Sequence, residues 1–65
     1  MLTRYQLLAR AHNDTNNRRR REIVTMTCSQ SDSVTYQVAE YWAKRYAEEL
    51  DWLSEELQKE ETKGE

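Results

Sequence analysis

The sequence predicts an α+β fold in which a short N-terminal helix, a two-stranded β-hairpin and a long C-terminal helix follow one another. Residues 39–62 contain neither proline nor glycine and are rich in Ala, Glu, Leu and Lys, which are good helix formers. Residues 22–28 and 34–38 alternate two sets of side chains and are dense in β-branched residues, which favours strands. Because a hairpin alone is barely stable in water, we expect the long helix to pack across it.

Residues 2–12 predict the first helix, because Leu, Ala, Gln and Arg dominate this segment. Tyr5, Leu8 and His12 follow a spacing of three and four residues, which places them on one helix face. The next segment, 13–17, reads Asn-Asp-Thr-Asn-Asn and predicts a turn, since these short polar side chains bond to nearby backbone. His12 is therefore expected at the end of the first helix.

The connection at residues 29–33 leaves a second interpretation open. As a hairpin loop, this segment lacks the glycine that the tightest hairpin turns prefer. Ser31, Asp32 or Ser33 could instead cap a helix that starts near residue 33. The alternative fold is then all-α, either a helical hairpin or a three-helix arrangement.

Length and composition predict one small domain over residues 1–65 with a thin core and a frayed segment at residues 60–65. Apolar residues make up 37% of the chain, below the roughly 45–50% of globular proteins. One cysteine cannot form an intramolecular disulfide, and one histidine beside it cannot complete a four-ligand zinc site. We therefore expect no metal and no cofactor, and a partner chain is the remaining usual source of stability.

The distribution of residue types predicts a cytoplasmic protein. No apolar run approaches the roughly 20 residues of a membrane-spanning helix, so no membrane partner is expected. Residues 1–11 are interrupted by polar and basic side chains, which is unlike a signal peptide. The unpaired Cys28 fits a reducing compartment.

The long C-terminal helix carries an apolar seam at heptad spacing. The seam residues are separated by 4, 3, 4, 3 and 4 positions, and they are Ala39, Ala43, Tyr46, Leu50, Leu53 and Leu57. We expect this Ala39–Leu57 seam to pack on the protein's own core. A simple two-stranded coiled coil between two copies is disfavoured, because glutamates flank the seam and would meet. A basic segment such as the first helix, with Arg4 and Arg10, is a better neighbour.

A second face of the same helix predicts an interaction surface. Tyr41 and Trp52 are eleven residues apart, which is close to three helical turns, so they lie on one side. Large aromatic side chains and arginine are over-represented at interfaces. The expected partner-binding residues are Val38, Tyr41, Trp42, Arg45, Glu48 and Trp52. The alternative is that these rings are covered by the hairpin.

Catalysis is not expected, because the sequence has no phosphate-binding loop, no Ser-His-Asp set and no metal-ligand spacing. The basic run of Arg18, Arg19, Arg20 and Arg21 is the strongest indication of nucleic-acid binding, since arginines bind phosphates. Residues 1–39 carry a net charge of +3 and residues 40–65 a net charge of −5. The basic run could equally neutralise the acidic helix or protect a strand edge.

These features favour a small non-enzymatic regulator that acts by protein–protein interaction. The preferred partner is another protein, for which a basic surface would complement the acidic helix; a homo-oligomer and a nucleic acid are the alternatives. Small size, a thin core and the lack of catalytic groups are typical of accessory proteins from phages and mobile elements, which is an analogy only. The alternative function is a small nucleic-acid-binding regulator that uses Arg18–Arg21.

Overall fold

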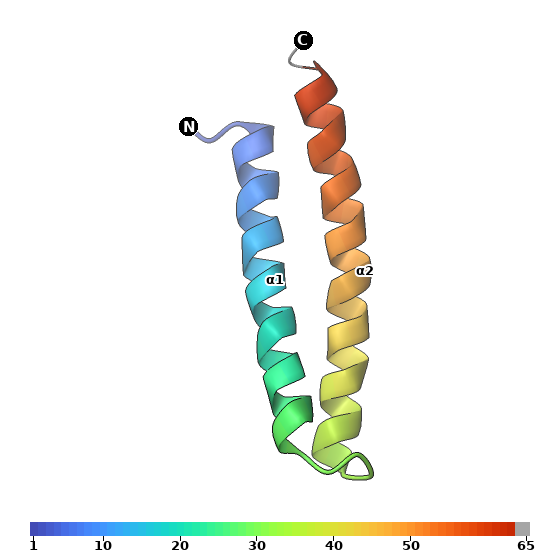
Figure 1. Ribbon diagram of the computed structural model, residues 1–65. Helices are drawn as coiled ribbons and strands as arrows, with labels where there is room; N and C mark the ends of the chain where they lie inside the picture. Colours follow the sequence, from blue (N-terminus) through green and yellow to red (C-terminus); the bar gives the residue numbers. More distant parts are fainter. Residues whose placement is uncertain (64–65) are drawn as a thin grey trace.

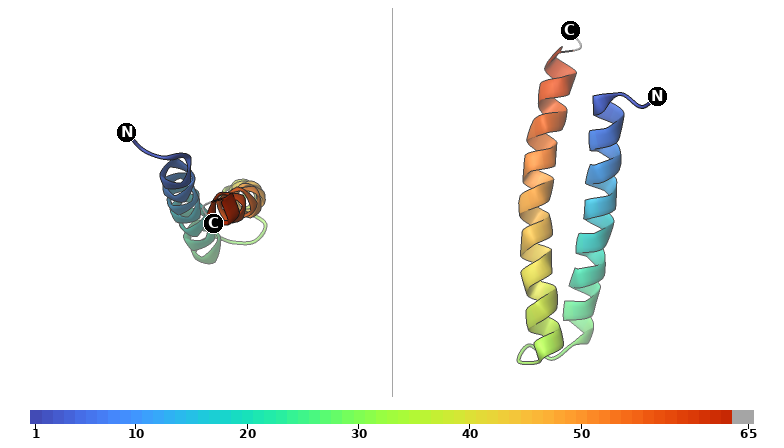
Figure 2. Two further views of the ribbon diagram at one scale, coloured as in Figure 1. Left: turned by 90° about the horizontal axis from the view of Figure 1, so that it is seen from above. Right: turned by 180° about the vertical axis from the view of Figure 1, so that it is seen from behind.

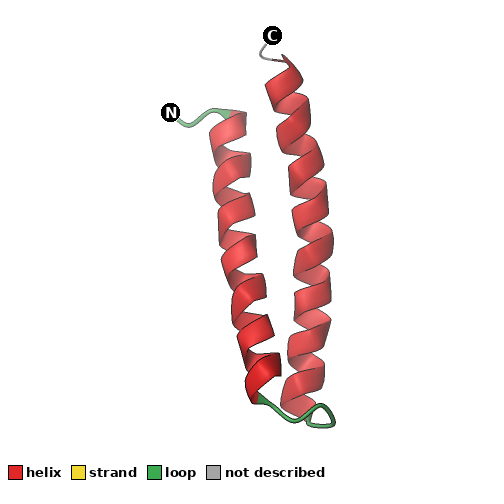
Figure 3. Ribbon diagram, viewed as in Figure 1, coloured by secondary structure: helices red, strands yellow, loops and turns green. Residues whose placement is uncertain are grey.

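The chain folds into a helical hairpin of two long antiparallel helices. The computed structural model describes residues 1–63, with α1 at Arg4–Cys28 and α2 at Val34–Lys63 (Figure 1). Figure 3 shows helix and loop but no strand in this part of the chain. The predicted α+β fold with a β-hairpin is therefore wrong, and the all-α helical hairpin, our alternative interpretation, is the observed architecture.

α1 continues without a break through both the predicted turn at 13–17 and the predicted strand at 22–28. No proline or glycine interrupts the segment. The hydroxyls of Thr25 and Thr27 donate to the carbonyls of Arg21 and Ile23, at 3.1 and 2.9 Å, one turn back. A threonine hydroxyl within a helix can satisfy its hydrogen-bonding capacity in this way. Residues 22–28 are helical despite their preference for strands, because α2 packs against α1 along its whole length and tertiary packing outweighs propensity.

Side-chain caps define where both helices begin. The Thr3 hydroxyl accepts a hydrogen bond from the Gln6 amide at 3.1 Å, and the Gln6 side chain accepts one from the Thr3 amide at 2.9 Å. This reciprocal pair is a capping box. At the start of α2, the Ser33 hydroxyl accepts from the Tyr36 amide at 3.1 Å. Of the three predicted cap residues, Ser33 is the one that performs this role.

The inner face of α2 is the Ala39–Leu57 seam. Ala39 and Leu53 are 1% and 3% exposed, and the other seam residues are half-buried against α1. The opposing face of α1 buries Leu8 and Thr15. Among the described residues, Leu8, Thr15, Ala39 and Leu53 are the only buried side chains. The core is therefore a single thin stripe between two helices.

The molecule is one layer thick. Its principal dimensions are 49 × 20 × 12 Å, and the two views of Figure 2 show the helices side by side with nothing above or below them. The start of α1 and the end of α2 lie at the end of the hairpin away from the 29–33 loop (Figure 1). The helix α2 runs to Lys63, so residues 60–63 of the segment expected to fray are helical, while residues 64–65 lie outside the described range. No helix in the described part of the chain is both long and apolar enough to cross a membrane.

Candidate functional site

The predicted interaction residues form an exposed surface on α2, which we call the aromatic surface: Val38, Tyr41, Trp42, Arg45, Glu48 and Trp52. Tyr41, Trp42 and Trp52 are 54%, 43% and 53% exposed. The predicted alternative, that a hairpin covers these rings, does not apply, because α1 packs on the other side of the helix. Val34, one turn before Val38, extends the apolar area toward the loop.

Contacts between neighbouring side chains hold the central rings of this surface in place. The Tyr41 and Trp42 rings meet edge to face with centroids 5.2 Å apart, and Trp42 stacks on Tyr46 at 5.9 Å. Tyr46 belongs to the half-buried seam, so this stack ties the exposed surface to the core. The Arg45 guanidinium lies 5.9 Å from the centroid of the Tyr41 ring, within the range of a cation–π contact. The rings are therefore preorganised for contact.

Acidic side chains border the aromatic surface. A shallow depression beside Trp42 is lined by Arg45, Tyr46, Glu48 and Glu49. Glu49 accepts a hydrogen bond from the buried Thr15 hydroxyl at 3.4 Å, which links this rim to α1. An apolar centre with a charged rim is the usual anatomy of a protein–protein interface.

The basic run Arg18–Arg21 lies in the second half of α1 and does not form one face. Four successive helical residues spread over about 300°, so Arg19 is half-buried toward α2 while Arg18, Arg20 and Arg21 are exposed. Within the described residues, none of the four guanidinium groups forms an ion pair. Because the segment is helical, the predicted role of guarding a strand edge does not apply.

A groove between the helices brings the basic run next to α2. Its walls come from both helices, and the side chains that line it are Arg19, Ile23, Met26, Glu40, Ala43, Lys44 and Ala47. Lys44 and Arg45 are thus at the same level of the hairpin as Arg18–Arg21. The sequence did not indicate this clustering, because it depends on the antiparallel alignment of the helices.

Ion pairs join the helices at the open end of the hairpin. Arg4 contacts Glu56 at 3.1 Å and Glu60 at 2.8 Å, and Lys59 contacts Glu56 at 3.2 Å. Hydrogen bonding from Lys59, followed by its charge and the contact with Arg4, holds the pKa of Glu56 below its usual value despite some desolvation. Arg4 pairs with the acidic helix as expected, whereas Arg10 makes no ion pair among the described residues.

Most of the inner face of α1 is polar, and its heptad spacing was not part of the prediction from the sequence. From Leu8 the 4-3-4-3-4 spacing continues through His12, Thr15, Arg19, Glu22 and Met26, and all six side chains are buried or half-buried. The His12 ring lies 3.3 Å from the Ser54 hydroxyl, so His12 is an inner-face residue and not at the helix end. The heptad spacing is therefore present in the sequence of α1, but polar residues occupy four of its six positions.

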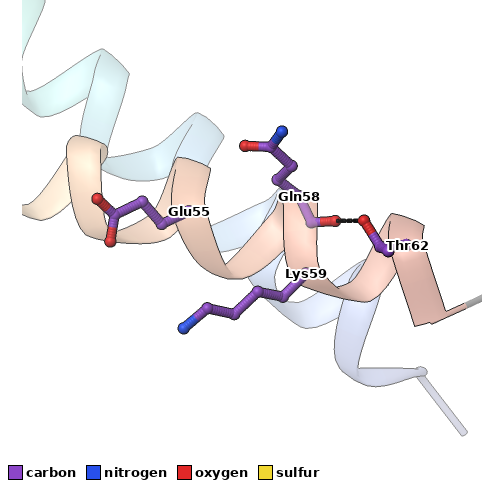
Figure 4. Close-up of a pocket in the computed structure, with 4 residues that line it drawn as sticks. All are labelled: Glu55, Gln58, Lys59 and Thr62. Atoms are coloured by element: carbon purple, nitrogen blue, oxygen red, sulfur yellow. Dashed lines mark hydrogen bonds between the residues drawn. The ribbon is translucent and has the colours of Figure 1, made fainter.

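Other surface features of the described residues do not form a reactive site. A shallow depression near the end of α2 is lined by Glu55, Gln58, Lys59 and Thr62, where the Thr62 hydroxyl donates to the Gln58 carbonyl at 2.9 Å (Figure 4). All four side chains belong to one helix and are exposed. No group of three His, Cys, Asp or Glu side chains within the described range could hold a metal ion. Cys28 is a free, exposed thiol.

Comparison of the chain with protein-family models, with curated proteins and with solved structures found no match.

Proposed function

We propose that this protein is a non-enzymatic protein–protein interaction module whose contact surface is the aromatic surface of α2. One observation carries the proposal: three large rings are about half exposed on a helix whose other side already packs against α1. A two-helix protein needs only one apolar face per helix for its own core. The additional apolar area is therefore available for a partner.

The acidic rim indicates the chemistry of that partner. Glu48 and Glu49 lie between Arg45 and Trp52 in the sequence, and both are exposed. Charges at the rim of an interface mainly accelerate association and select the partner. A partner with an apolar cleft bordered by basic groups fits this surface, and binding of this kind weakens with increasing salt.

The test is capture of a partner from lysate by the intact protein and by a Tyr41→Ala, Trp52→Ala variant. Removing two exposed anchor side chains of an interface costs about 2 kcal/mol or more each, so capture is expected to fall at least tenfold. Circular dichroism should show unchanged helix content, because neither ring belongs to the core.

A Leu2→Ala, Val24→Ala variant is the matched control. Both side chains are exposed and apolar but lie outside the aromatic surface, so capture should be unchanged. Equal loss of the captured protein in both variants, or unfolding of the Tyr41/Trp52 variant, would contradict the proposal.

Nucleic-acid binding through Arg18–Arg21 is a second candidate, supported by the unpaired guanidinium groups and by Lys44 and Arg45 at the same level. Each lost phosphate contact reduces the slope of log affinity against log salt by about one. Anisotropy with labelled duplex and single-stranded DNA at low salt should detect binding, with a slope about two lower for Arg18→Ala, Arg21→Ala and unchanged for Lys59→Ala. Absence of binding at low salt ends this candidate.

A further inference from the structure

The hairpin lacks a second layer. Stable domains usually enclose a core between two packed layers of secondary structure, and chains this short rarely bury enough apolar surface on their own. Here only Leu8, Ala39 and Leu53 are buried apolar residues in the described part of the chain. We propose that a second copy of this chain covers one broad face of the hairpin in the antiparallel orientation and completes a four-helix bundle.

The orientation follows from how charge is distributed along the long axis. The loop half, residues 18–47, carries six basic against three acidic side chains, a net charge of +3. The open half, residues 1–17 and 48–63, carries four basic against eight acidic side chains, a net charge of −4. Interhelical contacts such as Thr15–Glu49 and Tyr5–Glu61 establish the antiparallel alignment behind this division.

A second copy with its long axis reversed places each basic half on the partner's acidic half. A parallel arrangement would place like halves together, which is unfavourable. Apart from Ala43, which also lines the groove, the Ala39–Leu57 seam plays no part in this contact, because α1 already occupies it. The dimer is therefore compatible with the glutamates that disfavour a two-stranded coiled coil along the seam.

The face that receives the second copy is the one with the groove between Ile23 and Met26 of α1 and Ala43 and Ala47 of α2. It is the broad face that leaves the aromatic surface accessible, since Ala47 and Trp52 are about 140° apart around α2. The proposed dimer thus goes beyond the proposed function and does not compete with it. Each bundle would display two aromatic surfaces.

Contact between Lys44 of one copy and Asp51 of the other is the most direct test of this arrangement. They are seven residues apart, about two helical turns, so both lie on the groove side of α2. A two-fold axis beside Ala47, close to the middle of α2, brings Lys44 of each copy near Asp51 of the other. The Lys44 side chain is 73% exposed, and within its own chain it contacts only Glu40, at 3.0 Å, among the ion pairs of the described residues.

The dimensions of the broad face are compatible with a dimer interface of ordinary size. The broad face extends over 49 × 20 Å, and a standard specific interface buries about 800 Å² of each partner. A close approach of two hairpins over most of that face therefore meets the requirement. Small side chains at Ala43 and Ala47 allow the two α2 helices to come close together at the axis.

Sedimentation equilibrium of the intact protein over a wide concentration range tests the proposal. We expect a monomer–dimer equilibrium that shifts toward monomer as salt increases. Lys44→Asp or Asp51→Lys alone should weaken the dimer about tenfold or more, because each places like charges in contact twice. The double swap Lys44→Asp, Asp51→Lys should return the dissociation constant to near its original value.

Lys59→Asp is the matched control. Lys59, like Lys44, is exposed and pairs with a glutamate of its own helix, but it lies away from the groove face. This variant should dimerise as the intact protein does, and so should Tyr41→Ala, Trp52→Ala. The second result separates the dimer from partner capture by the aromatic surface.

Three results would overturn the proposal. A monomer at every concentration excludes the dimer, while the capture experiment still tests the aromatic surface independently. A dimer that the double swap fails to restore, with circular dichroism showing intact helices, excludes the Lys44–Asp51 pairing. Loss of the dimer in the Tyr41/Trp52 variant excludes the groove face.

Discussion

At the scale of single residues, Glu56 joins the two helices at the open end of the hairpin through its ion pairs. It receives Lys59 from its own helix and Arg4 from α1, with only 16% of its side chain exposed. These cations favour the ionised carboxylate, which explains why its pKa lies below the ordinary value of 4.5. Glu56 therefore links folding to proton binding at the open end of the hairpin.

We expect Glu56→Gln to reduce the loss of stability in acid. A carboxyl whose pKa is lowered by folding stabilises the folded state above pH 4.5, and this contribution disappears as the pH falls through the lower folded pKa. Urea unfolding between pH 7 and pH 3 should therefore show a shallower decline for the variant. Glu55→Gln, an exposed neighbour, is the control. Identical acid profiles for both variants would contradict this role of Glu56.

At the scale of the elements, each helix begins at a side-chain cap, and α1 shows how a cap and a continuous partner outweigh local preference. Residues 22–28 favour a strand by composition, and residues 13–17 favour a turn. Both segments are helical because the capping box at Thr3 begins the helix and α2 packs against α1 along its length. Most helical stability in proteins comes from such packing and not from propensity.

Thr3→Ala should destabilise the hairpin by about 1 kcal/mol, the usual cost of losing an N-cap side chain. Thermal unfolding followed by circular dichroism measures the change. Thr27→Ala is the matched control, because the Thr27 hydroxyl only donates back to the Ile23 carbonyl, and its removal should change stability by less than about 0.5 kcal/mol. Equal effects of the two substitutions would show that the capping box does not limit stability.

At the scale of the whole molecule, the antiparallel alignment turns a sequence with a basic first part into a rod with a basic end and an acidic end. Arg18–Arg21 come level with Lys44 and Arg45, while Arg4 and Arg10 lie among the acidic residues of α2. The rod is also a single layer, 12 Å in its smallest dimension. The proposed dimer, with its Lys44–Asp51 exchange, belongs to this scale because no single residue or helix indicates it.

The sequence by itself determined the long C-terminal helix from residue 39 onward and its division into a seam and an aromatic surface; Ser33 was one of three possible caps in the alternative fold. These features depend on local propensity and on apolar periodicity within one segment, which a single chain reveals. The predicted partner-binding residues also lie together on the helix, since their spacing is set by the helical repeat alone.

Only the tertiary structure decided that residues 13–28 are helical. The inner face of α1 includes His12, Thr15, Arg19 and Glu22. Because these residues are polar, their heptad spacing does not appear as an apolar pattern in the sequence, and only the contact with α2 shows that they face inward. The clustering of charges by level, the groove and the missing second layer likewise arise from the alignment of two distant segments. Side-chain caps determine where the two helices begin. Packing between the helices determines how far α1 continues and which side chains of the hairpin remain exposed.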